Sequence, residues 1–101
     1  MSKEIQEGLL DFIAKNFFVE KGEINLDKSL VDEGIIDSMG LIEIVDYLED
    51  EFSVDIHEDQ MTRENFGSIM KIVKFVEDEI KKSELLKVVS GWYENEYQEK
   101  S

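Results

Sequence analysis

Apolar residues recur with a helical period in three stretches of the chain, and each stretch predicts an amphipathic helix. The stretches span about residues 3–18, 38–52 and 68–82. The apolar positions of the first are Ile5, Leu9, Phe12, Ile13 and Phe17. Those of the second are Leu41, Ile44, Val45, Leu48 and Phe52, and those of the third are Ile69, Ile72, Val73, Val76 and Ile80. These faces are the predicted core of an all-α domain.

The two segments between these helices are long and have no sustained period. Residues 20–37 carry isolated apolar anchors among polar residues: Ile24, Leu26, Leu30, Ile35 and Ile36. We expect this loop to be pinned across the core, and Gly22 to mark a stop soon after the first helix. Residues 53–67 predict a loop, a short helix near 58–64 and a core anchor at Phe66.

The chain divides into a predicted domain of residues 1–82 and a C-terminal extension of residues 83–101. Apolar residues in the extension permit one more amphipathic helix, although Gly91 weakens that pattern. These residues are Leu85, Leu86, Val89, Trp92 and Tyr93. The extension is therefore predicted to be helical or partly disordered. Its aromatic cluster of Trp92, Tyr93 and Tyr97 is a candidate partner-docking tail, with packing on the bundle or disorder as the alternatives.

The charge balance narrows the classes of partner. The 101 residues carry a formal net charge of −14, and the isoelectric point is about 4.3. Nucleic acid and anionic membrane surfaces are themselves negative, so basic protein surfaces or divalent cations fit better as partners. The N-terminus lacks a signal peptide's apolar run, and no apolar run approaches the ~20 residues that span a bilayer. We expect a cytoplasmic monomer.

The composition also limits the chemistry. The chain contains no cysteine, which excludes disulfides and thiolate chemistry. Its one histidine, His57, leaves little from which to build a metal site or a catalytic triad, and is most simply a surface loop residue. At 42% hydrophobic residues, the chain can bury a modest core but not a large enclosed active site. We expect no catalytic residue and no metal ligand.

The outward face of the second helix is acidic. At ~100° per residue, the side opposite the apolar stripe holds Met39, Glu43, Asp46 and Asp50, with Ile42 and Glu49 beside them. From Ser29 to Thr62 there are 11 Asp and Glu residues and not one Lys or Arg. Such a face either is a solvated surface that aids solubility or meets basic partners.

One hydroxyl lies at the predicted start of this helix. Asp37 is a good N-cap residue, which makes Ser38 the first helical residue and points its hydroxyl outward. The free N–H groups and the positive end of the helix dipole favour an anion there, so a phosphodiester on Ser38 would be stabilised. By itself, however, an Asp-Ser pair favours a plain helix start, because this pair is common before helices.

The surroundings of Ser38 resemble the acyl carrier and peptidyl carrier protein family. That family has a D-S-L motif at the start of its second helix, followed by an acidic amphipathic helix ending near E-E-x-F. Here Asp37-Ser38-Met39 stands for the motif, and the helix ends in Glu49-Asp50-Glu51-Phe52. The resemblance covers about residues 3–82. It implies a four-helix bundle with a long loop between helices one and two.

Two positions depart from the commoner pattern. Met39 replaces Leu, a volume-conserving change that should be tolerated. Gly40 replaces the acidic residue of many fatty-acid carriers, which puts the assignment as a housekeeping fatty-acid carrier in doubt. Discrete carriers that serve an adenylating ligase, including those resembling D-alanyl carriers, often have Gly at this position. The run from Glu64 to Ile69 is also similar to such carriers.

The resemblance implies the chemistry at Ser38. This residue would carry 4'-phosphopantetheine, transferred from coenzyme A by a phosphopantetheinyl transferase. The thiol of that arm would hold an acyl or aminoacyl group for a loading ligase and downstream acyl-transfer enzymes, in fatty acid or secondary metabolite biosynthesis. Asp37 and Met39 would flank the attachment site. The chain itself would be no enzyme.

The resemblance also gives the acidic face a role in weak, salt-sensitive partner binding. The residues implied are Met39, Ile42, Glu43, Asp46, Glu49 and Asp50. Family members can shelter an acyl chain in the core, with a lining here of Phe52, Ile56, Met61, Phe66 and Ile72. An ordinary filled core is at least as well supported for a carrier of short or polar groups.

Two other classes compete with this interpretation. A calcium-binding protein would need D-x-[DN]-x-[DN]-G loops ending in Glu, and the window that begins at Asp46 has Leu48 and His57 at ligand positions. An unmodified helical interaction module would keep the acidic face and make Ser38 dispensable. The intact Asp37-Ser38 pair argues against this module without excluding it.

Overall fold

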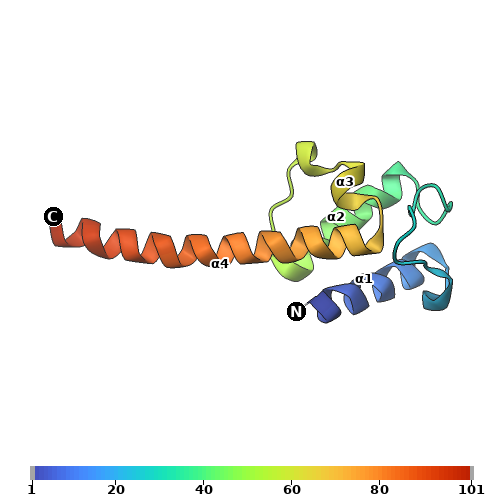
Figure 1. Cartoon of the computed structure of the whole chain (residues 1–101), viewed down its shortest axis with the longest axis horizontal. Coiled ribbons are helices and arrows are strands. Elements are labelled where there is room, and N and C mark those ends of the chain that lie inside the picture. Colours follow the sequence, from blue (N-terminus) through green and yellow to red (C-terminus); the bar gives the residue numbers. More distant parts are fainter. Residues whose placement is uncertain (1, 101) are drawn as a thin grey trace.

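The computed structural model describes the backbone of residues 2–100 and the side chains of residues 2–86. Over this range the chain is helical, without a strand (Figure 1). The α-helices are α1 (Ser2–Phe17), α2 (Ser38–Phe52), α3 (Arg63–Phe66) and α4 (Ile69–Lys100), and the short 3-10 helices are η1 (Lys21–Glu23) and η2 (Glu58–Gln60). The predicted all-α architecture of the acyl carrier type is confirmed.

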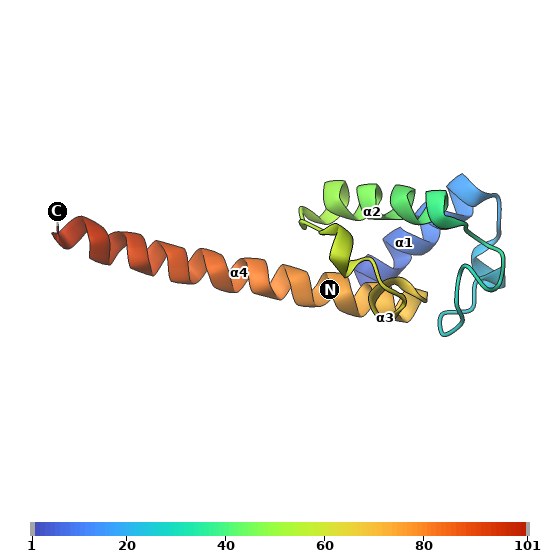
Figure 2. The same cartoon turned by 90° about the horizontal axis from the view of Figure 1, so that it is seen from above.

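Three helices build the core. α1 packs against both α2 and α4, and α2 also contacts the start of α4 (Figure 2). The side chains with no exposed surface come from the predicted apolar stripes: Ile5, Leu9, Ile13, Ile44, Leu48, Ile69, Ile72 and Val76. Burial of each such side chain contributes roughly 1.5–3 kcal/mol, which makes this shared core the main stabilising feature of the bundle.

The first helix ends within one residue of the predicted bound, but Gly22 does not terminate it. Phe18 adopts a left-handed backbone conformation with φ of 57°, so α1 stops at Phe17 and Gly22 lies later, inside η1. A bulky residue rarely adopts this conformation. The Phe18 side chain is also 91% exposed. A solvated aromatic residue, rather than the predicted glycine, therefore accompanies the end of α1.

The long loop between α1 and α2 is pinned as expected. The N–H of Leu30 donates to the carbonyl oxygen of Gly67 at 3.1 Å, and the N–H of Met70 donates to that of Leu26 at 3.1 Å. Leu30 itself is only 1% exposed, and Ile36 is buried directly before α2. These contacts hold residues 26–36 of the loop against the core. They therefore fix the position at which α2 begins.

The third helix was predicted in the wrong place. The segment near 58–64 divides into η2 and the later helix α3. The cause is Thr62, whose hydroxyl oxygen accepts from the N–H of Asn65 at 3.3 Å and so caps a new helix. Phe66 ends α3 as a buried core residue, as expected.

Residues 83–100 continue α4 rather than forming a separate helix. The helix runs through Gly91, because one interior glycine costs only about 1 kcal/mol relative to alanine. α4 projects well past the other helices (Figure 1), and Leu85 and Leu86 are exposed on it. The side chains of Trp92, Tyr93 and Tyr97 lie outside the described residues. Their role and the division after residue 82 remain predictions.

Candidate functional site

The start of α2 is built by one carboxylate. Asp37 is extended, with φ of −109°, and its Oδ1 accepts from the N–H of Gly40 at 2.8 Å. Its carbonyl oxygen accepts from the N–H of Leu41 at 3.0 Å. Asp37 is therefore the N-cap, as predicted, and Ser38 is the first residue of the helix.

Ser38 is exposed at this helix end. The first N–H groups of an α-helix have no partner inside the helix, and the dipole adds a partial positive charge there. A phosphate ester on the Ser38 hydroxyl fits this setting electrostatically. His57 lies beyond the opposite end of α2, exposed and 3.8 Å from Asp55, so the one histidine of the chain is not placed to activate this hydroxyl.

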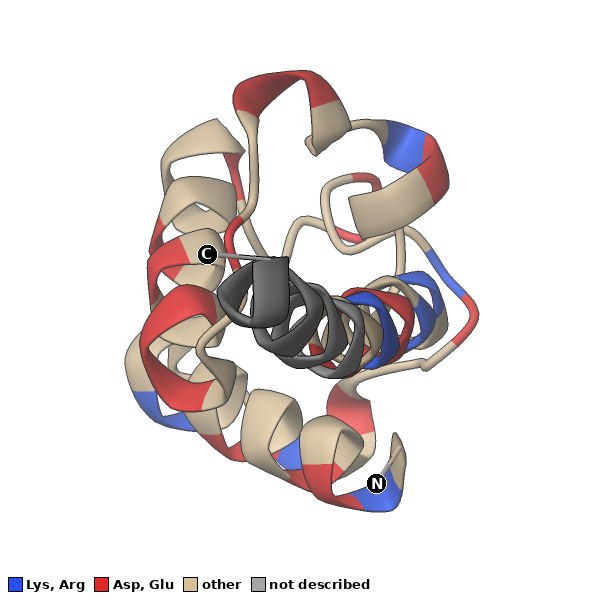
Figure 3. Cartoon of the chain, turned by 90° about the vertical axis from the view of Figure 1, so that its left-hand side faces the viewer, with Lys and Arg blue, Asp and Glu red and all other residues tan. Residues whose placement is uncertain are grey.

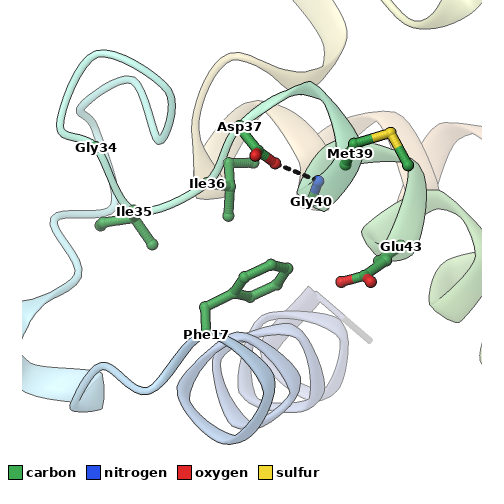
Figure 4. Close-up of a pocket in the computed structure, with 8 residues that line it drawn as sticks. All are labelled: Phe17, Gly34, Ile35, Ile36, Asp37, Met39, Gly40 and Glu43. Atoms are coloured by element: carbon green, nitrogen blue, oxygen red, sulfur yellow. Dashed lines mark hydrogen bonds between the residues drawn. The ribbon is translucent and has the colours of Figure 1, made fainter.

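A groove opens beside Ser38, between the end of α1 and the start of α2 (Figure 4). We call it the serine groove; its volume is about 550 Å³. Its lining consists of Phe17, Gly34, Ile35, Ile36, Asp37, Met39, Gly40 and Glu43. Asp37 and Met39, the two neighbours of Ser38, both line it. The predicted attachment residue is thus at the edge of a groove with a mixed apolar and acidic lining.

Gly40 allows α1 to approach the first turn of α2. A Cβ at this position would lie 2.9 Å from Cε1 of Phe17 and 3.0 Å from Cβ of Ile36. Such distances are shorter than ordinary van der Waals contacts, so the Phe17 ring packs against α2 only because residue 40 has no side chain. This close contact is a structural reason for glycine at position 40, where many fatty-acid carriers have an acidic residue.

Part of the predicted partner face lines a second groove, which we call the acidic groove. It lies between α1 and α2 and has a volume of about 490 Å³. Its lining consists of Phe12, Asn16, Glu43, Asp46, Tyr47, Asp50 and Glu51. The rings of Phe12 and Tyr47, both in this lining, stack with centroids 4.4 Å apart. The structure therefore brings Glu43, Asp46 and Asp50 into one groove with an aromatic pair.

The other members of the predicted face lie elsewhere on α2. Glu49 is half-buried, and its Oε2 accepts from the N–H of Ile56 at 3.1 Å. This carboxylate holds the loop after α2 and is less free for a partner than the sequence indicates. Met39 and Ile42 are exposed apolar side chains, as expected.

Burial and charge act together on Tyr47. Its partial burial raises the pKa of the phenol above the ordinary value of 10.0, and the negative charges of Glu51 and Asp11 raise it further. The phenol therefore stays neutral through the physiological range and remains a hydrogen-bond donor at the acidic groove.

Sequence reasoning did not identify the α1 residues at these grooves. Phe12 and Phe17 were assigned to the buried stripe, but both are half-buried and line the grooves. Gly40 was the sequence signal for this contact, because a residue without a side chain indicates that another part of the chain approaches closely. It does not identify which part. The neighbour is identified only when α1 is placed against α2.

The remaining predicted residues lie in the core or form no site. Of the proposed acyl-chain lining, Ile56, Phe66 and Ile72 are buried, whereas Phe52 and Met61 are half-buried. Within the described residues, no three His, Asp or Glu side chains are placed to hold a metal ion. No described helix, α4 included, combines the length and apolar character needed to cross a membrane.

Comparison with known proteins decides the family. The family model for the C-terminal ACP domain of the highly reducing polyketide synthase sdgA matches residues 1–88. The chain belongs to the acyl carrier protein family. The acyl carrier protein of Exiguobacterium sibiricum is 34% identical over 77 residues, which cover 76% of this chain and 90% of that protein.

Other relatives of the chain are D-alanyl carrier proteins. That of Streptococcus suis is 30% identical over 73 residues, which cover 72% of this chain and 91% of the relative. That of Streptococcus pyogenes serotype M5 is 28% identical over 74 residues, covering 73% and 92%. Proteins of this family are carriers without catalytic activity, so the chain is a carrier protein and not an enzyme.

Proposed function

We propose that this acyl carrier protein holds an acyl or aminoacyl group on 4'-phosphopantetheine attached to Ser38. The observation that carries the proposal is the position of an exposed serine as the first residue of the capped, acidic helix α2. When bound, the arm supplies the thiol on which the cargo is carried as a thioester. A chain without cysteine has no other source of a thiol.

The attachment step needs only the Ser38 hydroxyl from this chain. The Ser38 oxygen forms a bond to the β-phosphorus of coenzyme A, and the bond within the pyrophosphate breaks. Adenosine 3',5'-bisphosphate leaves, and the serine proton passes to a base of the phosphopantetheinyl transferase. Asp37 contributes by fixing the first turn of α2, so that the hydroxyl is presented at one position.

Partners follow from this assignment. They are the transferase, a ligase that loads the arm and the enzymes that take the cargo on, and the exposed carboxylates of Glu43, Asp46 and Asp50 would meet their basic side chains. The D-alanyl carriers among the relatives support an aminoacyl cargo loaded by an adenylating ligase, and the acyl carrier among them supports an acyl cargo. A cytoplasmic location fits both kinds of cargo, because the donor, coenzyme A, is cytoplasmic. The expected monomer fits both as well.

The test is intact mass spectrometry after incubation with coenzyme A, Mg²⁺ and a broad-specificity phosphopantetheinyl transferase. We expect one added phosphopantetheine on the native chain and none on Ser38→Ala, with unchanged helicity by circular dichroism. Ser53→Gly is the matched control. It removes a hydroxyl at the other end of α2, where φ is 53° and glycine is well tolerated, so it should be modified normally.

Three outcomes would contradict the proposal. Modification of Ser38→Ala would place the arm on another residue. A native chain that is folded, yet stays unmodified both with a transferase that works on a control carrier and with lysate of the source organism, would favour the unmodified interaction module. Unfolding of Ser38→Ala alone would assign the hydroxyl a structural role.

A further inference from the structure

The two grooves form one path that begins at the neighbours of Ser38. Asp37 and Met39 line the serine groove, and Glu43 lines both this groove and the acidic groove. The Phe17 ring in the first makes an edge contact with Phe12 in the second, with centroids 6.4 Å apart, and Phe12 stacks on Tyr47. A row of aromatic rings therefore follows the line of contact between α1 and α2, beginning with Phe17 beside Gly40.

The length of this path suits a phosphopantetheine arm. From Ser38 to Asp50, α2 rises about 18 Å at about 1.5 Å per residue. An extended arm attached at Ser38 covers a similar distance. The volumes of the two grooves, about 550 and 490 Å³, lie within the range of about 300–1,000 Å³ that small-molecule sites occupy.

The lining matches the chemical character of the arm. Pantetheine has a branched apolar group near its phosphate, followed by two amides with N–H donors and a terminal thiol. The apolar group can pack on Phe17 and Ile36, and the carboxylates of Glu43 and Asp46 can accept from the amides. The path therefore offers partners of suitable chemistry to both parts of the arm.

We propose that the arm lies along this α1–α2 path when no partner enzyme is bound, with its thiol at the acidic groove. This inference rests on the proposed modification of Ser38. It differs from storage in the core, where Ile56, Phe66 and Ile72 are already buried and would have to separate before a chain could enter. A small cargo can remain at the open groove, whereas a long acyl chain would stay largely in water.

The reactivity of the thiol tests the proposal. The arm would carry the only thiol of the modified protein, because the chain has no cysteine. In the acidic groove the lining covers one side of this thiol, and nearby carboxylates disfavour the reactive thiolate. We therefore expect alkylation by iodoacetamide, a neutral reagent, to be slower for the native holo-protein than for a variant that cannot hold the arm.

Phe17→Ala is that variant, and Phe18→Ala is its matched control. Phe17 lines the serine groove, whereas its neighbour Phe18 lies outside the lining and is exposed. If the arm is held about four-fifths of the time, release raises the alkylation rate about fivefold in Phe17→Ala and leaves it unchanged in Phe18→Ala. Equal rates in the native chain and both variants, each confirmed by mass to carry one arm, would overturn the proposal.

Amide NMR shifts between the apo and holo forms of the native chain give a measurement without a variant. We expect changes at Ile35, Gly40, Glu43 and Tyr47, along the path. Changes confined to residues 37–39 would mean a free arm, and changes at Ile56 and Ile72 would mean entry into the core; both outcomes reject the path. Because mass spectrometry reports attachment separately, failure here leaves the modification of Ser38 untouched.

Discussion

At position 37, one side chain combines a hydrogen-bonding role and a charge. The Asp37 carboxylate accepts from the N–H of Gly40 and also brings a negative charge next to Ser38, the proposed attachment residue. The hydrogen bond stabilises the first turn of α2, and we propose that the charge contributes to recognition by partners. Substitution can separate them, since asparagine keeps the acceptor oxygen and loses the charge.

We expect Asp37→Ala to lower the free energy of unfolding by about 1 kcal/mol, because the cap of α2 is lost. Asp37→Asn should unfold at nearly the native denaturant concentration. Chemical denaturation followed by circular dichroism measures both values. Equal destabilisation by the two substitutions would show that the charge, and not the hydrogen bond, holds the first turn.

Local signals allowed these residues to be predicted, and non-local contacts did not. Asp37 was identified as the N-cap from neighbouring positions in the sequence, because capping acts over three residues, and the family resemblance of the surrounding motif singled out Ser38. The packing of Phe17 on Gly40 and the bond from Ile56 to Glu49 join different parts of the chain. No short-range pattern encodes such pairs, so the grooves and the altered role of Glu49 emerged only from the fold.

At the scale of elements, the loop before α2 depends on one buried anchor. Leu30 is 1% exposed, and its neighbour Val31 is 48% exposed. We expect Leu30→Ala to lower the free energy of unfolding by about 2–5 kcal/mol, because it leaves a cavity in the core. Val31→Ala, in the same loop, should change it by less than about 0.5 kcal/mol.

Thermal or urea unfolding of the two variants provides the comparison. If both substitutions lowered the free energy of unfolding by a similarly small amount, the core would have closed over the cavity left by Leu30. The backbone hydrogen bond from Leu30 to Gly67 would then hold the loop without the Leu30 side chain.

The contact between α1 and α2 should respond to alkaline pH. Burial first, and the charges of Glu51 and Asp11 second, raise the pKa of Tyr47 above 10.0 in the folded state. Its contribution to stability is therefore present below pH 10 and is lost as pH rises through the folded pKa. Tyr47→Phe should remove this component and flatten the alkaline fall in unfolding free energy. Parallel pH profiles for the native chain and Tyr47→Phe would show that the phenol is not the responsible group.

Element boundaries show the same division between local and non-local information. The bounds of α2 followed from its stripe and from Asp37, whereas those of α3 depended on the cap at Thr62, which the periodicity does not reveal. α1 ends at Phe17 and is followed by Phe18, in a conformation that a sequence pattern would assign to glycine. Strong periodicity thus predicted that α1, α2 and the first half of α4 are helical, whereas the side-chain cap at Thr62 decided where α3 lies and no pattern revealed how far α4 continues.

At the scale of the whole molecule, charge is unevenly distributed. α2 has acidic residues but no Lys or Arg, whereas four lysines belong to the first half of α4: Lys71, Lys74, Lys81 and Lys82 (Figure 3). Exposed charges separated by more than a Debye length of about 10 Å at 0.1 M salt act weakly on each other. The negative field along α2 therefore comes from the acidic residues of the helix together with its N-cap, Asp37.

Reversal of that field should slow modification. We expect Glu43→Lys with Asp46→Lys to lower the kcat/KM of the phosphopantetheinyl transferase roughly tenfold at low salt, with little loss of helicity. Glu58→Lys with Asp59→Lys is the matched control, because it changes net charge equally at η2. The difference between the two pairs should shrink at high salt. Equal rates for both pairs at low salt would reduce the acidic face to a solubility surface.

The bonds that pin the loop also order events during synthesis. Leu26 and Leu30 precede Ser38 in the chain, but their backbone partners Met70 and Gly67 come after it. A growing polypeptide therefore exposes the serine well before the residues that fix its surroundings have been made. A modifying enzyme that requires the folded start of α2 would therefore not modify nascent or truncated chains. It would use coenzyme A only on carriers whose helix bundle is complete.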